Sequence, residues 1–362
     1  MRWWWLLLLL LLLVGCAGES ECVAPPPSEE ALGAPTTWEQ AWLESDGLPT
    51  SPAPHFLDGE EGVPLAYRDW VPEGWDGQGD VVLFVHGSSA HSELYAVLGE
   101  GLMRRHVYAR LIDVRGHGLS VCRAAGECGA PESAPREIVD DGVYYPGRIG
   151  DSHDRHQITR DLSLHLTDLH ARFPQARFHL SGHSSGGGAV SRFVEHNGWG
   201  LLESVILLSP FNHASQPQNH LQSYECGRIE GSPYAQVHMG ALGDALRGNL
   251  HRYVLYFNKG EPYVDALDTL SNTWTTTQGM QVDDVDRFHV AFTGPVLWVA
   301  AEQDALLDLE ASRREFERFP GGGAFVTVRE TSHIGLSWSD AVAGLMVDWL
   351  SQPEQVESIL SP

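Results

Sequence analysis

The segment at residues 182–186 carries residue types suited to nucleophilic chemistry. It reads GHSSG, so that Gly182 and Gly186 each lie two positions from Ser184. The apolar run at 176–180 predicts a buried strand before it, and the following residues predict a helix. A serine on such a sharp strand-to-helix turn exposes its hydroxyl, and the glycines let strand and helix approach each other. The pattern predicts a nucleophilic serine; the alternative is an ordinary loop rich in glycine and serine.

A serine hydroxyl becomes a good nucleophile only when a base removes its proton. Asp304 follows a continuous apolar run at 295–301, and His333 follows a strand predicted at 324–328. Because the carboxyl ends of parallel strands meet at one edge of a sheet, we expect both side chains to lie beside the serine. Asp304 could instead cap a helix, in which case Asp308 is the alternative acid, and a histidine at this position could simply lie on a surface loop.

Two backbone N–H groups that could stabilise a developing negative charge can also be located. The apolar run at 80–85 predicts a strand that ends in His86, Gly87 and Ser88. A tetrahedral intermediate needs two N–H groups aimed at its oxygen. Ser185, directly after the proposed nucleophile, is expected to supply one, and Ser88 the other, with Gly87 allowing the backbone to come close. The alternative for this second loop is an ordinary turn at the end of a strand.

Taken in order, these segments resemble the α/β-hydrolase superfamily, and more narrowly its monoacylglycerol lipase and serine aminopeptidase-like branch. The resemblance covers about residues 55–352. One further motif is an opening hairpin at residues 56–59 and 63–72. A second, at residues 91–92, continues the loop after the 80–85 strand, and a third is the turn DVRGHGLS at 113–120, after the fourth strand. The resemblance implies an α/β fold with a mostly parallel eight-stranded sheet flanked by helices. It also implies a cap inserted at about 211–293.

The same resemblance implies a serine hydrolase with Ser184, Asp304 and His333 as its triad and no metal or organic cofactor. Cleavage of a small-molecule or lipid carboxylic ester is the leading expectation. Peptide hydrolysis of the aminopeptidase kind is an alternative. It would need carboxylates for a free amino group, and the candidates in the cap segment are Glu225, Glu230, Asp265 and Asp268. A non-catalytic surface-binding lipoprotein is a third reading, which the complete set of catalytic residues disfavours.

The first 16 residues are typical of an export signal. One arginine precedes a leucine-rich run, which is shorter than the roughly 20 residues that span a bilayer. Residues 13–16 (LVGC) resemble a bacterial lipobox, which implies cleavage after residues 1–15 and acylation of Cys16. A plain signal peptide and an N-terminal anchor are the alternatives. We therefore expect an exported protein that is lipid-anchored to a bacterial membrane, on its periplasmic or cell-surface side.

The amino-acid composition of the remaining chain differs between the segment before residue 55 and the segment after it. Residues 16–54 are rich in proline, glutamate, serine and glycine, which is typical of a flexible tether, with a short helix around 38–43. The hydrolase domain is expected at 55–352, with helices at 157–173, 186–196, 309–319 and 340–350, and a C-terminal tail at 353–362. The formal net charge of −25 disfavours nucleic acid as a partner. The oligomeric state has no signature in the sequence.

Four cysteines besides Cys16 bear on an exported protein, because disulfides form in oxidising compartments. Cys122 and Cys128 close a short loop and form the most plausible pair, although Cys22 and Cys226 leave three pairings open. A metal site is not expected.

Three further groups of residues could have a functional or a purely structural role. His153 and His156 lack a third ligand that could be named for a metal. Tyr144 and Tyr145, in the long segment at 121–154, could line the site or pack beneath their loop. The same holds for the aromatic and apolar residues of the cap, which could form a lid or the cap's own core: Tyr253, Val254, Leu255, Tyr256, Phe257, Tyr263, Trp274 and Met280.

Overall fold

The computed structural model describes residues 35–44, 48–122, 128, 140–216, 222–223, 229–230, 234–257, 266–353, 356 and 358–361. The expected signal peptide at 1–15, Cys16, much of the expected tether and the cysteines at 22 and 226 lie outside these described residues. Within the described ranges, no helix has the length and apolar character needed to cross a bilayer.

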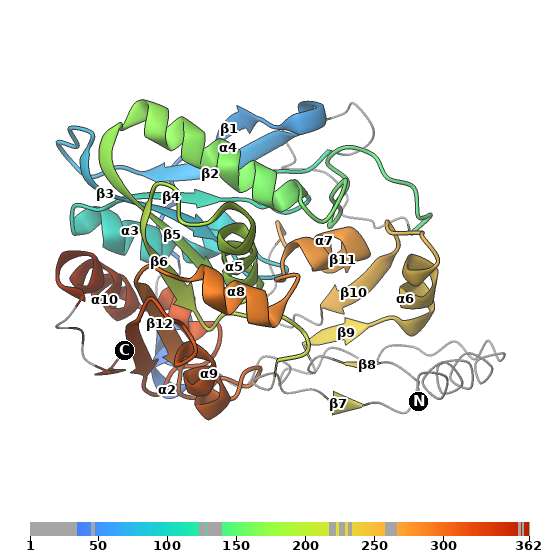
Figure 1. The fold of residues 1–362 in the computed structure, drawn as a ribbon. Coiled ribbons are helices and arrows are strands. Elements are labelled where there is room, and N and C mark those ends of the chain that lie inside the picture. Colours follow the sequence, from blue (N-terminus) through green and yellow to red (C-terminus); the bar gives the residue numbers. More distant parts are fainter. Residues whose placement is uncertain are drawn as a thin grey trace.

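A nine-stranded sheet forms the centre of the molecule (Figure 1), in the order β1-β2-β4-β3-β5-β6-β12-β13-β14. The strands are β1 His55–Asp58, β2 Pro64–Trp70, β3 Gln78–Val85, β4 Tyr108–Ile112, β5 Gln175–His183, β6 Leu202–Leu208, β12 Val296–Ala301, β13 Gly323–Val328 and β14 Ile359–Leu360. The pairs β1–β2 and β2–β4 are antiparallel and the remaining pairs are parallel. The expected α/β-hydrolase fold is confirmed. The ninth strand, β14, comes from the segment that we expected to be a tail.

Helices cover both faces of this sheet because successive side chains of a strand point to opposite sides. In β3, Val81, Leu83 and Val85 join one apolar cluster, whereas Val82 and Phe84 join the other. The first cluster packs under α4 Gln157–Arg172 and α5 Ser185–Asn197, and the second under α3 Ala96–Arg104 and α10 Asp340–Ser351. A strand buried on both faces reads as an uninterrupted apolar run, which is why these strands could be found in the sequence. Helix α9, Leu309–Phe316, lies between β12 and β13.

A second sheet lies between β6 and β12 in the chain, inside the segment expected to be a cap, and Figure 1 shows it beside the main sheet. Its five antiparallel strands run in the order β11-β10-β9-β8-β7. They are β7 Gln222–Ser223, β8 Ile229–Glu230, β9 Ala235–Val237, β10 Tyr253–Phe257 and β11 Ser271–Thr273. Three short helices accompany them: α6 Met239–Leu246, α7 Trp274–Gly279 and α8 Val285–Ala291.

Helix α2, Thr37–Leu43, precedes the hydrolase domain and packs against it. Its apolar side chains Trp38, Trp42 and Leu43 join a small cluster around Trp338, which lies in the short 3₁₀ helix η3, Gly335–Trp338. Two further 3₁₀ turns are η1 Glu60–Gly62 and η2 Ser92–Tyr95. The expected short helix is therefore present, and it contacts the domain rather than standing apart from it.

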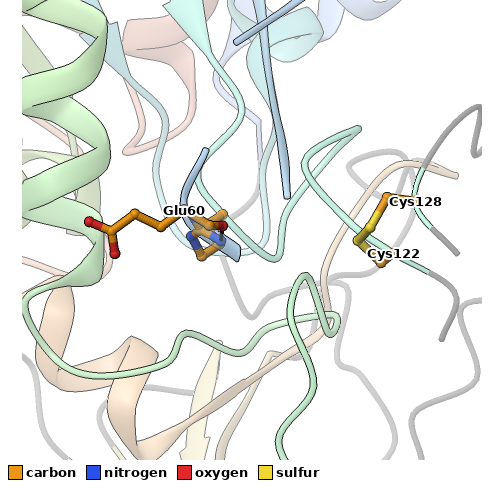
Figure 2. The surroundings of a disulfide bond; sticks show 4 residues. Glu60, Cys122 and Cys128 are labelled. Atoms are coloured by element: carbon orange, nitrogen blue, oxygen red, sulfur yellow. Dashed lines mark hydrogen bonds between the residues drawn. A yellow bond between two sulfur atoms is a disulfide. The ribbon is translucent and has the colours of Figure 1, made fainter. Parts of the chain in front are cut away.

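Cys122 and Cys128 are joined by a disulfide in the structure (Figure 2). The two residues also form an isolated antiparallel bridge, so their backbones run side by side. The N–H of Cys122 donates to the carbonyl oxygen of Gly147 at 2.7 Å, which fixes this end of the loop. Residues 123–127 lie outside the described ranges, and the Cys122–Cys128 pairing stays a prediction.

Candidate active site

Ser184 occupies a strained turn between β5 and α5. Its backbone has φ 54° and ψ −124°, a conformation that is costly for a residue with a side chain. The surrounding glycines are required by space: a Cβ on Gly182 would lie 2.4 Å from the carbonyl oxygen of Gly186, and one on Gly186 would lie 2.3 Å from that of Val85. The turn therefore presents the serine side chain above the sheet, as its sequence context predicted.

Asp304 and His333 lie beyond the carboxyl ends of β12 and β13 and contact each other. Nδ1 of His333 lies 2.7 Å from Oδ2 of Asp304, and both side chains are almost fully buried. The other carboxylate oxygen, Oδ1, accepts the N–H groups of Leu306 and Leu307. Asp304 thus does both things that the sequence allowed, because one oxygen caps a turn while the other holds the histidine.

The rival acid, Asp308, has a different position and partner. Its carboxylate caps α9 by accepting the N–H of Ala311 at 2.7 Å. The structure therefore pairs His333 with Asp304.

Burial alone would raise the pKa of the Asp304 carboxyl. The charge and N–H of His333, together with the N–H of Leu306 and the hydroxyl of Ser209, hold that pKa below its usual range. Ser209 follows β6 with φ 35° and was not identified from the sequence. The available signal was its place at the carboxyl end of the strand next to β5 and β12.

The second ring nitrogen of His333 has no protein partner. Nε2 is buried and forms no hydrogen bond with any of the described residues. Because Nδ1 faces a carboxylate, the ring proton belongs on Nδ1, and Nε2 is left with an acceptor lone pair. His333 and Ser184 line the same pocket, so this lone pair and the serine hydroxyl belong to one site.

The loop after β3 lies directly against the serine. A Cβ built on Gly87 would be 3.1 Å from the Cβ of Ser184, so a larger residue here would crowd the nucleophile. The hydroxyl of Ser88 donates to that of Ser185 at 2.6 Å, which places the two expected oxyanion residues side by side. The carbonyl oxygen of Ser88 accepts the Tyr234 hydroxyl at 2.8 Å.

A buried hydrogen-bond chain links this loop to the loop that carries His333. The N–H of Gly87 donates to the Tyr95 hydroxyl at 2.9 Å, and that hydroxyl lies 2.7 Å from Nδ1 of His183. Nε2 of His183 lies 3.0 Å from the carbonyl oxygen of His333, so it carries the proton and Nδ1 accepts from Tyr95. Burial, with the charge of His333 second, lowers the pKa of His183 to about 3, and the ring stays neutral.

His86 fixes the same loop from below. Its Nε2 accepts the N–H of Val114 at 2.9 Å, so Nδ1 carries the proton and donates to the carbonyl oxygen of Gly87 at 2.7 Å. Burial lowers the pKa of His86 to about 3, with the charge of His117 acting in the same direction. The neutral His86 ring therefore connects the carbonyl oxygen of Gly87 to the backbone N–H of Val114.

The pocket above the serine has a mostly apolar wall. Apart from the site residues, its lining side chains are Ala90, Leu94, Tyr95, Tyr234, Ile334, Ser337 and Trp338. Tyr234 comes from the cap segment, and sequence reasoning missed it because an isolated tyrosine there carries no pattern. Trp338 was missed for the same reason.

The aromatic residues named from the sequence lie elsewhere. Tyr253 is buried and its hydroxyl donates to the carbonyl oxygen of Ile149. Phe257 is buried in a small apolar cluster, and Met280 belongs to the main core. Tyr144 stacks on His153. Tyr263 lies outside the described residues. For the described members, packing was the alternative that the sequence left open, and packing is what the structure shows.

One group of described residues has ligand atoms close enough to hold a metal ion: Glu195, His196 and Asp283. The guanidinium groups of Arg192 and Arg155 lie 2.6 and 3.4 Å from the Asp283 carboxylate. These cations already neutralise the acidic charge, so the group is built as an ion-pair network. His153 and His156 have separate neighbours, Glu61 and Arg192 respectively, and do not converge on a common point.

Comparison with known proteins agrees with this geometry. Residues 78–333 match the family described as "Serine aminopeptidase, S33". A curated non-heme chloroperoxidase, CPO-A1 of Kitasatospora aureofaciens, is 29% identical over 149 residues, which cover 41% of this chain and 41% of that protein.

Similar solved structures include Est1E of Butyrivibrio proteoclasticus with bound ferulic acid, at a TM-score of 0.53 and 19% identity, covering 82% of this chain and all of that one. Another is a soluble variant of monoglyceride lipase from Saccharomyces cerevisiae with a substrate analogue, at a TM-score of 0.55 and 14% identity, covering 84% and 96%. These similarities establish the fold. The family match extends over most of the chain, from β3 to His333, and the protein therefore belongs to the serine aminopeptidase S33 family of α/β-hydrolases.

Proposed function

We propose that this protein hydrolyses carboxylic esters through a Ser184–His333–Asp304 triad. The observation that carries the proposal is the buried Asp304–His333 pair: Nε2 of His333 has no hydrogen-bond partner among the described residues, and His333 lines the same pocket as Ser184. A buried histidine with one nitrogen held by a carboxylate and the other left without a partner is arranged to accept a proton.

In the proposed reaction, the Ser184 oxygen attacks the ester carbonyl carbon while its proton moves to Nε2 of His333. The N–H groups of Ser88 and Ser185 stabilise the resulting oxyanion. Collapse of the tetrahedral intermediate expels the alcohol, which takes the proton from Nε2 and leaves an acyl-serine. Water then gives a proton to Nε2 and attacks the acyl carbon. The acid is released and the proton returns to the Ser184 oxygen.

The pocket favours neutral acyl groups of short to medium length. Its wall of Leu94, Ile334 and Trp338 offers apolar surface, and burying a methylene stabilises a complex by roughly 0.8 kcal/mol. One similar structure is Est1E with bound ferulic acid, and another is named as a monoglyceride lipase. Both names are compatible with an ester substrate.

The test combines an activity-based probe with the Ser184→Ala variant. A fluorophosphonate should label the wild type, and Ser184→Ala should abolish labelling and leave at most about 10³–10⁴-fold acceleration over water. Failure of the wild-type protein to react with the probe would support the non-catalytic surface-binding reading instead.

Peptide hydrolysis is the second candidate, and it has one structural observation in its favour. Burial raises the pKa of Tyr95 and Tyr234, two residues of the pocket wall, and the charge of the buried Asp268 acts in the same direction. A carboxylate whose charge acts on this wall would attract a substrate amino group. Comparing kcat/KM for an acyl ester series and an aminoacyl anilide series decides between the two. A preference for a free amino group that is lost on acetylation of the substrate would favour the peptidase.

We also propose that the protein is exported and lipid-anchored through Cys16. The support is the lipobox-like sequence LVGC and the leucine-rich run before it. The wild type should partition with membranes and carry acyl mass on an N-terminal Cys16, whereas Cys16→Ser should leave unprocessed precursor. One acyl chain binds a membrane only marginally, so stable anchoring requires at least two. An intact mass that places an unmodified N-terminus elsewhere would overturn the proposal.

A further inference from the structure

We propose that helix α2 supports the active site and that its residue Glu39 is a positioning residue for His333. This inference rests on the proposed function, because it assigns a role to the loop that carries the catalytic base. Glu39 precedes the hydrolase domain in the chain and lies 294 residues from His333, yet its side chain ends beside that histidine.

The contact is a buried charge-assisted hydrogen bond. Oε1 of Glu39 accepts the N–H of Ser332 at 2.8 Å, and Oε2 accepts the N–H of Thr36 at 2.7 Å. Glu39 is 0% exposed. A fully buried carboxylate is costly unless both oxygens are satisfied, so the Ser332 N–H is a structural requirement of this arrangement. The bond fixes the Thr331–Ser332 peptide group, one residue before His333.

The catalytic-histidine loop is shaped to receive this carboxylate. A Cβ on Gly335 would lie 1.6 Å from Oε1 of Glu39, so any larger residue at 335 would displace the Glu39 side chain. Gly335 therefore leaves the space that the carboxylate fills. The α2 side chain and the loop backbone are complementary in shape as well as in charge.

Two tryptophans hold the helix in place. Nε1 of Trp38 donates to the carbonyl oxygen of Glu330 at 2.7 Å, on the same loop. The rings of Trp42 and Trp338 stack with centroids 4.7 Å apart and an interplanar angle of 15°. Trp338 lines the substrate pocket, so α2 supports the pocket wall and the histidine loop together.

The remaining contacts of the loop explain why Glu39 matters for position. The N–H of Gln303 donates to the carbonyl oxygen of Thr331, and His183 bonds the carbonyl oxygen of His333. Glu39 supplies the bond to the residue between them, Ser332. Without Glu39, Ser332 has no hydrogen bond to α2 among its described contacts. The backbone before His333 can then shift, and the histidine ring moves relative to Ser184.

The experiment compares Glu39→Ala, Glu39→Gln and the control Glu44→Gln in the full chain. Glu44 lies at the exposed end of the same helix and pairs with Gln40 instead of the loop. Amide hydrogen exchange in a Ser184→Ala background needs no activity. There, Glu39→Ala should speed exchange at Ser332 by at least about 10-fold, while β12 amides and the Glu44→Gln protein stay unchanged.

The catalytic arm uses the same variants with Ser184 intact. Glu39→Ala should lower kcat for a p-nitrophenyl acyl ester by about 10- to 100-fold with little change in KM, since a small misplacement of the base costs this much. Glu39→Gln keeps an acceptor oxygen and should retain most of the activity. The rate of fluorophosphonate labelling should fall in parallel with kcat.

The outcomes separate this inference from the proposed function. A wild-type protein that does not react with the probe refutes the proposed function, while the exchange result still tests the Glu39 contact. If the wild type is active and Glu39→Ala matches it in both kcat and Ser332 exchange, Glu39 does not position His333. Equal losses of kcat in Glu39→Ala and Glu44→Gln would also overturn the positioning role of Glu39. Such losses would come from a general disturbance of α2 and not from the missing Glu39–Ser332 hydrogen bond.

Discussion

At the scale of single residues, the site depends on side chains that each satisfy two partners. Asp304 caps a turn with one oxygen and holds His333 with the other. His183 accepts from Tyr95 and donates to the backbone of His333. Such double use fixes each ring and carboxylate in one orientation, which preorganises the proposed proton path from Ser184 to His333.

Asp304→Asn should reduce kcat/KM by about 10⁴-fold, because an amide no longer selects the histidine tautomer with a free Nε2. Asp308→Asn is the matched control, since Asp308 also caps a turn but contacts Ala311 instead of the histidine. It should cost at most about 1–2 kcal/mol of stability and leave kcat near that of the wild type. Steady-state kinetics and thermal unfolding of both variants measure this, and a reversed order of the two kinetic effects would make Asp308 the acid.

At the scale of elements, the parts that could be predicted from the sequence are those with a continuous pattern. The strands β3, β5, β6, β12 and β13 are apolar runs, and the residues that follow β3, β5, β12 and β13 carry the proposed triad and the proposed oxyanion loop. Tyr234, Trp338 and Glu39 could not be predicted in their roles. Each acts through a contact with a segment distant in the chain, and neither its spacing nor its neighbours carry that information.

Tyr234→Phe tests how far the cap segment controls the oxyanion loop. The variant removes the hydroxyl that bonds the Ser88 carbonyl oxygen, so we expect kcat to fall by about 10-fold through a looser loop. Tyr253→Phe is the control, because its hydroxyl bonds the carbonyl oxygen of Ile149 in the same way but away from the site. Both should lose about 1 kcal/mol of stability. Equal kcat in the two variants would show that the Tyr234 hydroxyl of the cap segment does not contribute to oxyanion stabilisation.

The Cys122–Cys128 bond is a second prediction at this scale. Closing so short a loop should stabilise the fold by about 2 kcal/mol or less. Peptide mapping of the full-length protein without reductant should recover the two cysteines in one linked peptide. Recovery of both thiols in free form would refute the pairing.

At the scale of the whole molecule, the buried histidines link stability to pH. Burial lowers the pKa of His86, His165 and His183 to about 3, so the folded protein keeps all three rings neutral. In the unfolded chain they take up protons near pH 6.5. The unfolded state therefore binds more protons between these values, and acidification favours unfolding across that window.

We expect the free energy of unfolding to be fully retained above about pH 6.5 and to fall below it, by on the order of 1–2 kcal/mol per buried histidine at pH 5. The site carboxylate Asp304 has a lowered pKa and contributes to acid sensitivity only at lower pH, near and below its unfolded value of 3.8. Chemical denaturation at steps from pH 7.5 to 5 measures the slope. His165→Leu should reduce it by about one proton, because His165 is buried against Tyr67 and takes no part in the proposed reaction. His153→Gln, at a ring that is 54% exposed, is the control and should leave the slope unchanged. A stability that stays constant from pH 7.5 to 5, or an unaltered slope in His165→Leu, would show that these rings do not hold the neutral state on which the hydrogen-bond chain through His183 depends.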